Sequence, residues 1–256
     1  MNEHHTYNRL RAALVTGGAR RIGRAIAMSL SRAGYAVVLH ANRSRDEAEA
    51  LAREIAQQGG RAAVVVADLA DAGAVRGVIK SAQTFGPLAL LVNNASVFEE
   101  DAVGSLAVAG FERTMTVNLT APVFLAQDFA AQAPHGADAS IVNIVDQRVF
   151  KPTPKFFSYT LSKSALHMAT ATLAQALAPL RVNAVAPGPV LPSPRQNNEQ
   201  FAAQAAAVPL GHGPSPDDIA AAVLYLAGAR SVTGVTLAVD GGQHLAWRTA
   251  DSDLTE

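Results

Sequence analysis

The amino-acid sequence predicts a single α/β domain in which about seven parallel strands form a doubly wound sheet with helices on both faces. Short apolar segments alternate with longer segments of helical periodicity along most of the 256 residues. The short segments are continuously apolar, as is typical of parallel strands that are buried on both faces. The chain contains no internal repeat and no linker of biased composition, and its hydrophobic content of 49% allows one sizeable core.

The predicted strands are residues 12–16, 36–40, 62–67, 88–93, 140–145, 181–186 and 236–239. The predicted helices are residues 22–33, 45–58, 72–84, 111–133, 156–177 and 216–228. Glycine and proline mark several helix ends, for example at Gly34 and at Gly86-Pro87. We expect residues 1–9 and 248–256 to be tails around a domain at 10–247. A segment rich in proline and glycine, residues 190–213, is expected to be a mobile lid over a ligand crevice.

Charge and composition exclude several function classes. Basic and acidic residues number 21 each, so the chain has no positive excess for nucleic acid or anionic lipid. The sequence has no cysteine, which excludes disulfides, thiolate catalysis and cysteine-bound metal. The histidines have no metal-ligand spacing, and no apolar run approaches the roughly 18 residues of a membrane span. We therefore expect a soluble cytoplasmic protein that binds small molecules, with no metal, nucleic acid or membrane partner.

A glycine-containing turn follows the first predicted strand and leads directly into a helix. The turn reads Thr16-Gly-Gly-Ala-Arg-Arg-Ile-Gly23. Backbone N–H groups and the helix dipole at such a junction bind pyrophosphate. The spacing is not G-x-G-x-x-G, and an ordinary tight turn has a similar composition, but its position at the first strand–helix junction favours dinucleotide binding. The candidate cofactor residues here are Gly17, Arg20, Arg21, Ile22 and Gly23.

The end of the second strand indicates which dinucleotide is bound. Its candidate residues are His40, Asn42, Arg43 and Ser44. NAD-binding sites usually have an acidic residue here for the ribose hydroxyls, whereas an arginine accommodates a 2′-phosphate. A solvated basic loop would have the same composition. Because residues 40–45 contain no acid, we predict NADPH as the cofactor.

The third and fourth strands also end in candidate cofactor residues. Asp68 and Leu69 follow the third strand, where they would face an adenine or where Asp68 would cap the next helix. Asn94-Ala95-Ser96 closes the fourth strand, and these short residues would allow backbone to approach a cofactor or would form a plain turn. Phe98 would pack in the core or stack on a planar ring.

The fifth strand is followed by candidate proton-transfer groups. It ends in Asp146, and Tyr159 and Lys163 follow at positions i and i+4 on one helix face. A neighbouring cation lowers the pKa of a phenol by roughly 1–3 units, so this pair suits proton transfer, although an amphipathic turn has the same spacing. Asn118 lies among apolar residues of a predicted helix, where its amide makes a local structural bond or joins a proton relay.

Taken together, these motifs resemble the short-chain dehydrogenases/reductases. The resemblance rests on the ordered set Thr16-Gly17…Gly23, Asp68, Asn93-Asn94-Ala95, Asn118, Tyr159…Lys163, Pro187-Gly188 and Asp240-Gly241-Gly242. It implies a Rossmann fold, a nicotinamide cofactor, Tyr159 as proton donor and a homotetramer. It also implies that Lys163 binds the nicotinamide ribose and lowers the pKa of Tyr159, and that Asn118 holds a relay water. Pro187, Gly188 and Val190 would lie against the nicotinamide.

Three positions depart from the common pattern of that family. Arg21 and Ser96 stand where the family usually has glycine, and Asp146 stands in place of the usual catalytic serine. An ionised carboxylate cannot donate a hydrogen bond to a substrate carbonyl and repels the charge that develops on its oxygen. Asp146 therefore disfavours simple ketone reduction. It suits a nitrogen heterocycle, whose ring nitrogen gains a proton after hydride reaches the adjacent carbon.

The chain accordingly resembles the pteridine reductase branch of the family. The residues that carry this resemblance are Arg21, His40, Arg43, Ser44, Ser96, Phe98, Asp146, Tyr159 and Lys163. It implies NADPH-dependent reduction of a pterin or dihydropterin, with the ring between Phe98 and the nicotinamide, Ser96 on substrate or cofactor phosphate, and protons from Asp146 and Tyr159. Two alternatives stay open: a reductase of a small ketone, sugar or 3-oxoacyl substrate, and a catalytically weak NADPH-binding sensor.

Overall fold

The computed structural model describes residues 11–133 and 138–247, so both predicted tails lie outside the described residues. Seven parallel strands form one sheet in the order β3-β2-β1-β4-β5-β6-β7. The strands are β1 (Ala12–Val15), β2 (Ala36–Ala41), β3 (Ala62–Val66), β4 (Leu88–Asn93), β5 (Ser140–Ile144), β6 (Arg181–Pro187) and β7 (Thr236–Val239). The predicted fold class, a Rossmann-type sheet, is confirmed.

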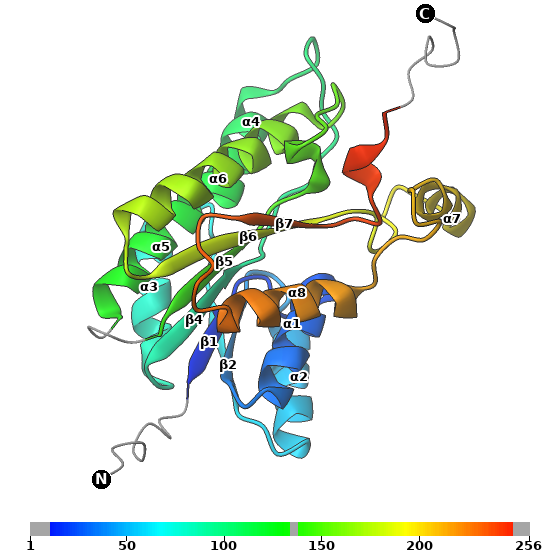
Figure 1. Cartoon of the computed structure of the whole chain (residues 1–256). Helices are drawn as coiled ribbons and strands as arrows, with labels where there is room; N and C mark the ends of the chain where they lie inside the picture. Colours follow the sequence, from blue (N-terminus) through cyan, green and yellow to red (C-terminus); the bar gives the residue numbers. More distant parts are fainter. Residues whose placement is uncertain (1–10, 134–137, 248–256) are drawn as a thin grey trace, which may run out of the picture.

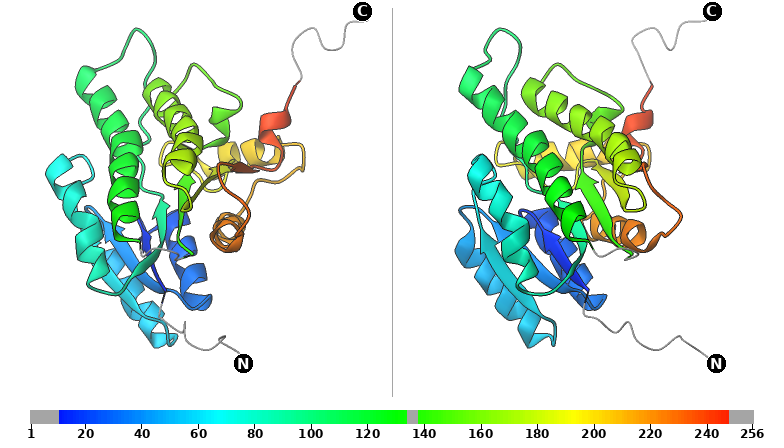
Figure 2. Two further views of the ribbon diagram at one scale, coloured as in Figure 1. Left: turned by 60° about the vertical axis from the view of Figure 1, so that its left-hand side comes forward. Right: turned by 90° about the vertical axis from the view of Figure 1, so that its left-hand side faces the viewer.

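Helices cover both faces of this sheet. They are α1 (Arg21–Arg32), α2 (Arg45–Gln57), α3 (Ala72–Gln83), α4 (Val108–Met115), α5 (Ala121–Gln132), α6 (Phe157–Ala176), α7 (Asn198–Ala206) and α8 (Pro216–Gly228). In Figures 1 and 2, α1, α2 and α8 lie on one face, and α3, α5 and α6 lie on the other. Each face encloses its own core: Val15 packs in the first and Leu14 in the second, because successive side chains of a strand point to opposite faces.

The sheet order reverses between β1 and β4, and this reversal positions the functional residues. In an open α/β sheet, ligands bind beyond the carboxyl ends of the strands where the order reverses. The register aligns Leu14 with Leu91 and Val15 with Val92. The segments that follow β1 and β4 therefore meet at the same edge of the sheet, which is where the sequence placed its first glycine turn and its Asn94-Ala95-Ser96 segment.

Two segments differ from the sequence predictions. The helix expected at 111–133 begins at Val108 and contains a π-helical turn, Thr116–Thr120, between α4 and α5. Part of the lid expected at 190–213 is the helix α7. Asn197 and Gln200 form a capping box at the start of α7, and the alanine-rich residues that follow favour a helix.

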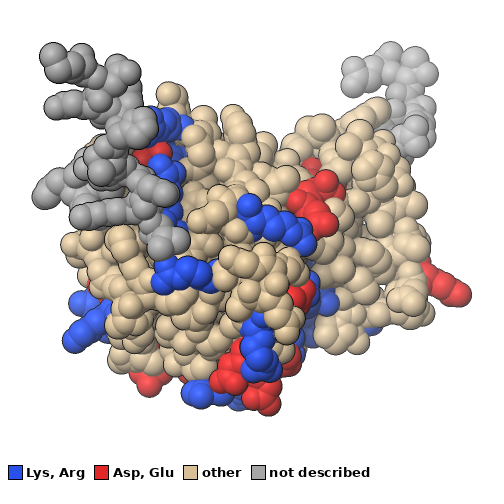
Figure 3. Space-filling model, turned by 90° about the horizontal axis from the view of Figure 1, so that it is seen from below, with Lys and Arg blue, Asp and Glu red and all other residues tan. Residues whose placement is uncertain are grey.

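Charged residues of both signs are interspersed on the face shown in Figure 3. Several form surface ion pairs, such as Arg24 with Glu54 and Arg76 with Asp128. This distribution agrees with the zero formal charge of the chain. No helix among the described residues is long and apolar enough to cross a membrane.

Candidate active site

In the turn after β1, backbone segments approach one another so closely that side chains would not fit between them. Gly17 has a φ of +61°, in the left-handed region that favours glycine. A Cβ added to Gly23 would lie 2.1 Å from the carbonyl oxygen of Gly17 and 2.7 Å from Nδ2 of Asn94. The same Nδ2 donates hydrogen bonds to the carbonyls of Thr16 (2.9 Å) and Gly17 (3.1 Å). Asn94 thus fixes the turn from the neighbouring strand.

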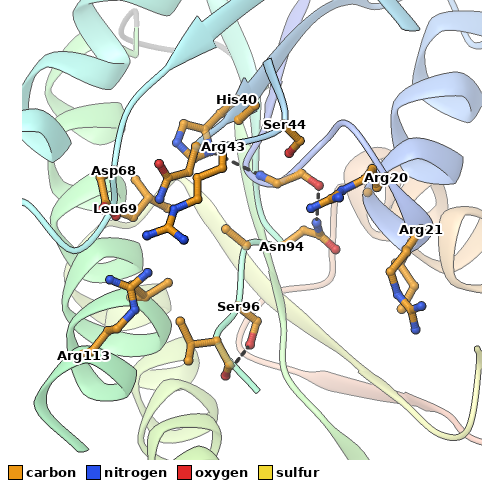
Figure 4. Close-up of a pocket in the computed structure, with 18 residues that line it drawn as sticks. Arg20, Arg21, His40, Arg43, Ser44, Asp68, Leu69, Asn94, Ser96 and Arg113 are labelled. Carbon is orange, nitrogen blue, oxygen red and sulfur yellow. Dashed lines mark hydrogen bonds between the residues drawn. The ribbon is translucent and has the colours of Figure 1, made fainter. Parts of the chain in front are cut away.

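A buried histidine holds the same turn from the other side (Figure 4). Nδ1 of His40 accepts a hydrogen bond from the backbone N–H of Gly17 at 3.2 Å, and Nε2 lies 3.1 Å from the carbonyl oxygen of Ala67. These partners assign the neutral tautomer that carries its proton on Nε2. Burial lowers the pKa of His40 from 6.5 to about 4, so the ring stays neutral near pH 7.

A cavity of about 450 Å³ opens at these strand ends. Fourteen of the predicted cofactor residues line it: Gly17, Arg20, Arg21, Ile22, Gly23, His40, Asn42, Arg43, Ser44, Asp68, Leu69, Asn94, Ala95 and Ser96. Figure 4 shows Arg43 pointing into the cavity from the end of β2. The structure therefore brings the predicted turn and the ends of β2, β3 and β4 together in one site.

The lining of this cavity has an excess of positive charge. Among the residues that the structure describes, it includes the four arginines Arg20, Arg21, Arg43 and Arg113 and a single carboxylate, Asp68. Guanidinium groups and the N–H groups at a helix N-terminus both bind phosphate oxygens. The cavity can therefore hold an elongated ligand that carries several phosphates.

Asp68 was expected either to face an adenine or to cap α3. Its Oδ1 accepts a hydrogen bond from the backbone N–H of Ala70 at 2.9 Å. The N-cap of α3 is Asp71, whose side chain accepts from the backbone N–H groups of Gly73 and Ala74. Asp68 therefore braces the turn beside the cavity, and the capping role belongs to Asp71.

Arg21 occupies an unusual backbone conformation. Its φ of +53° lies in the left-handed region, which costs a non-glycine residue roughly 1–2 kcal/mol. Its Nη2 donates to the carbonyls of Pro192 (3.0 Å) and Leu191 (3.4 Å). The side chain therefore ties the first turn to the segment that leads into α7.

The proton-transfer groups meet at the end of β5. The hydroxyl of Tyr159 donates a hydrogen bond to Oδ2 of Asp146 at 2.9 Å. The other carboxylate oxygen, Oδ1, accepts from the backbone N–H of Arg148 at 2.9 Å. Burial and the charge of Asp146 raise the pKa of Tyr159 well above 10, and Arg148 opposes that shift. The phenol is therefore protonated at neutral pH and acts as a hydrogen-bond donor.

Lys163 lies one helical turn after Tyr159 and is buried beside it. Its Nζ donates to the carbonyl oxygen of Ile144 at 2.8 Å and lies 5.7 Å from the centroid of the Tyr159 ring. Burial lowers the pKa of Lys163 to about 8. Lys163 was expected to lower the pKa of Tyr159, but burial and the adjacent carboxylate of Asp146 set the direction of that shift.

Asn118 lies on the π-helical turn and is fully buried. Its Oδ1 accepts from the backbone N–H of Val97 (2.7 Å) and from Ser96 Oγ (3.2 Å). Its Nδ2 donates to the carbonyl of Val97 (2.9 Å) and to Ser162 Oγ (3.0 Å). The side chain thus joins the segment after β4 to α6, as expected for the structural bond that was one of its two predicted roles.

The site also contains a stack of aromatic rings. The rings of Phe98 and Phe156 are parallel to within 8°, with centroids 4.3 Å apart. Phe98 also meets the ring of Tyr159 edge-on, at 4.7 Å between centroids. Asp101 accepts hydrogen bonds from the backbone N–H and the hydroxyl of Ser158, so the loop that carries Phe98 is fastened to the start of α6. Phe98 therefore lies at the proton-transfer groups.

Residues 11–203 match the family model for short chain dehydrogenases. The chain belongs to the short-chain dehydrogenase family. It is similar to FolM alternative dihydrofolate reductase 1 from Brucella suis, solved in complex with NADP: the identity is 54%, the TM-score is 0.91, and the match covers 94% of this chain and 98% of that one.

Two further comparisons extend the family match. A blue fluorescent protein from a metagenomic library, solved in complex with NADPH, is 35% identical with a TM-score of 0.85, and the match covers 91% of this chain and 97% of that chain. An uncharacterized oxidoreductase of Methylorubrum extorquens is 38% identical over 244 residues, which are 91% of this chain and 97% of that protein.

Five predicted cofactor residues of this short-chain dehydrogenase do not line the cavity. They are Tyr159, Lys163, Pro187, Gly188 and Val190. Gly188 packs so closely on the end of β7 that an added Cβ would lie 2.6 Å from Cα of Asp240. Val190 is buried in the core beneath α1 and α8.

Three residues of the site were not singled out from the sequence. Arg113 reaches the cavity from α4 opposite Arg43 (Figure 4), four residues before Val117, which lines the same cavity. Phe156 directly precedes α6 in a left-handed backbone conformation, for which a phenylalanine gives no signal in the sequence. Arg195, which lies beside Phe98, carries no signal in the sequence.

Proposed function

We propose that this short-chain dehydrogenase uses NADPH to reduce a pterin or dihydropterin. The observation that carries the proposal is the hydrogen bond between Tyr159 and Asp146, beside the ring of Phe98. A carboxylate at this position cannot donate to a ketone oxygen, but it can carry a proton to a ring nitrogen. The similarity to the Brucella suis reductase supports the same substrate class.

The residues present fit the proposed cofactor. The glycine turn admits a pyrophosphate where side chains would collide, as the position of a Cβ on Gly23 illustrates. Arg43, Ser44 and Arg20 would hold the 2′-phosphate, and no acid lies between residues 40 and 45 to oppose it. Tyr159, Lys163, Pro187, Gly188 and Val190 would complete the nicotinamide side. When bound, NADPH supplies hydride to the carbon next to a ring nitrogen of the substrate.

The protein's own groups would then move the proton. Tyr159 is protonated, because burial and Asp146 raise its pKa, and its hydroxyl is directed at Oδ2 of the carboxylate. The backbone N–H of Arg148 holds Oδ1, which fixes the carboxylate in one orientation. We propose that the Tyr159–Asp146 pair delivers one proton to the ring nitrogen as the adjacent carbon is reduced. Asn118 would keep Ser96 and Val97 in place beneath the substrate.

Residues 190–213, now including α7, would act as the lid over the substrate. The bonds from Arg21 to Leu191 and Pro192 support this role, because they connect the lid to the cofactor turn. We also propose that the enzyme is a cytoplasmic homotetramer, as the family resemblance implies. Exposed apolar side chains on α5 and α6, among them Phe124, Leu161 and Met168, support an assembly through these helices. Light scattering of the purified protein would measure its mass.

The rate of NADPH oxidation with a panel of substrates tests the proposed function. We expect turnover with 7,8-dihydrobiopterin, dihydromonapterin or dihydrofolate, and little with acetoacetyl thioesters or diketones. Turnover of the thioester or diketone without any pterin turnover would contradict the proposal. Cofactor binding without turnover of any substrate in the panel would point instead to a sensor.

A further inference from the structure

Two guanidinium groups lie beside the stacked rings of Phe98 and Phe156. Cζ of Arg148 is 5.5 Å from the centroid of Phe98 and 5.2 Å from that of Phe156. Cζ of Arg195 is 5.3 Å and 5.4 Å from the same centroids. Because each arginine is nearly equidistant from two parallel rings, it lies along the side of the stack. The pair therefore places two positive charges around one aromatic surface.

Among residues 11–133 and 138–247, these two arginines use few of their hydrogen-bond donors. Each guanidinium has five N–H donors. Arg195 donates one bond, from Nη2 to the carbonyl of Phe98 at 2.8 Å. The Nε of Arg148 is buried and has no hydrogen-bond partner among the described residues. Buried donors are normally paired, so an acceptor would stabilise this arrangement.

The carboxylates beside the two arginines form only long ion pairs with them. Arg148 Nη1 lies 3.6 Å from Asp146 Oδ2, which already accepts the bond from Tyr159. Arg195 Nη1 lies 3.6 Å from Glu99 Oε2, and the side chain of Glu99 is 74% exposed. An exposed ion pair of this length contributes little, because water and salt screen it. A ligand carboxylate can therefore replace Glu99 without leaving a buried charge unpaired.

We propose that Arg195, together with Arg148, binds the carboxylate of a substrate side chain. The planar ring of that substrate would lie at Phe98, and its acidic tail would extend between the two guanidinium groups. This inference rests on the proposed function and adds a preference to it: pterins with an acidic tail, as in folates, are favoured over pterins with a neutral hydroxylated tail. Guanidinium binds carboxylate with two parallel hydrogen bonds, which gives geometric selectivity as well as affinity.

Two variants with opposite expected effects test this preference. The measured quantity is the kcat/KM for dihydrofolate divided by the kcat/KM for 7,8-dihydrobiopterin. Arg195→Gln removes the charge and should lower this ratio about tenfold, because a charge-assisted bond is replaced by a weaker neutral one. Glu99→Gln removes the competing carboxylate and should raise the ratio about threefold. Arg53→Gln, an exposed residue of α2 on the other face of the sheet, is the control and should leave the ratio unchanged.

A binding measurement separates recognition of the tail from catalysis. p-Aminobenzoyl-glutamate, which has the acidic tail but no pterin ring, should inhibit the wild type competitively, and Arg195→Gln should weaken that inhibition. High salt should weaken it as well. Arg148 is not varied for this purpose, because its contacts with Asp146 would alter proton transfer too.

The outcomes distinguish this inference from the function on which it rests. If the wild type turns over neither pterin, the proposed function fails. If it turns over both, and Arg195→Gln leaves their ratio at the wild-type value, the function stands and the acidic-tail inference is wrong. A loss of both activities in equal proportion would also leave the ratio unchanged and would contradict the inference. A ratio that falls in Glu99→Gln contradicts it as well.

Discussion

The two halves of this site are constructed in different ways. Around the turn after β1, side chains hydrogen-bond to the backbone and stabilise its conformation. Asn94 and His40 both bond to Gly17, and a Cβ at Gly23 would collide with the carbonyl oxygen of Gly17. Around Asp146 and Phe98 the surface consists of side chains, and several of their polar groups have few partners. The binding surface of the first half therefore consists of rigid backbone, whereas that of the second half consists of side chains that can be substituted.

This difference explains how one fold serves many substrates. A rigid backbone surface recognises groups that every ligand of the site shares, such as phosphates, and tolerates few substitutions. A surface of side chains determines which substrates are distinguished, and its residues can be substituted without changing the sheet. Substitutions in the first half should therefore affect folding and cofactor binding together, whereas those in the second should affect turnover and leave the fold intact.

The largest effect is expected from Tyr159→Phe in the second half. Removing the hydroxyl takes away the proton donor to Asp146, and general acid catalysis contributes about 10²–10⁴-fold. We expect a loss of kcat in that range, measured by steady-state NADPH oxidation at saturating substrate, with normal thermal unfolding. The control is Tyr225→Phe, at a residue of α8 that is 61% exposed. A loss of kcat below about tenfold would rule out Tyr159 as the main donor.

Gly23→Ala should have the largest effect in the first half. The added Cβ would lie 2.1 Å from a backbone oxygen that cannot rotate away, so we expect about 3 kcal/mol of lost stability, at the upper end for overpacking. NADPH affinity should fall at the same time. Gly77→Ala on α3 is the matched control: its Cβ would meet nothing within 4 Å, and it should gain up to about 1 kcal/mol from helix propensity. Urea unfolding and cofactor fluorescence measure both effects. Equal stabilities of the two variants would contradict the steric requirement for glycine at position 23.

His40 makes the first half sensitive to acid. Its pKa is about 4 in the folded protein and 6.5 as its ordinary value, so the unfolded chain binds its proton first as the pH falls. Stability is therefore unaffected above 6.5 and declines between 6.5 and about 4, by about 3 kcal/mol in total. Unfolding measured across this range should show a flatter pH dependence for His40→Gln than for the wild type. The exposed His212 provides the control in His212→Gln, and an unchanged slope in His40→Gln would refute the assignment.

Phe156→Gly is expected to lower stability modestly and to weaken substrate binding. Phe156 has a φ of +56°, and relief of this strain should return roughly 1–2 kcal/mol. Loss of the stack on Phe98 removes about 0.5–1.5 kcal/mol, and loss of the half-buried ring removes apolar burial as well, so relief of the strain offsets only part of the cost. The KM for a pterin should nevertheless rise, because Phe98 loses the ring that fixes its orientation. Chemical denaturation and steady-state kinetics test the two statements separately, and an unchanged KM would show that Phe156 is not needed at the site.

The sequence predicted most of the first half. Parallel strands end at one edge of a sheet, so residues that follow successive strands are brought together whatever their long-range contacts. This is why the turn at Gly17, the pair Arg43 and Ser44, and Asn94 were all found. The structural bonds of His40 and Asn94 were not, because they depend on the register of neighbouring strands.

The second half was only partly predicted. Asp146, Tyr159 and Phe98 follow from motif positions, but Phe156 and Arg195 reach the site through a helix start and a long loop. Their geometry is set by tertiary packing, which local patterns do not encode. The capping pair of Asn197 and Gln200 did signal α7, and the density of prolines around it obscured that signal.

The central claim is that Asp146 makes this site a reductase of a nitrogen heterocycle. The most direct measurement compares NADPH oxidation by the wild type and by Asp146→Ser, each with 7,8-dihydrobiopterin and with a diketone. We predict that the wild type reduces the pterin and that Asp146→Ser loses most of this activity while retaining its fold. A wild type that ignores the pterin, with Asp146→Ser gaining diketone reduction, would contradict the claim, because Asp146 would then act only against ketones and the substrate would belong to another class.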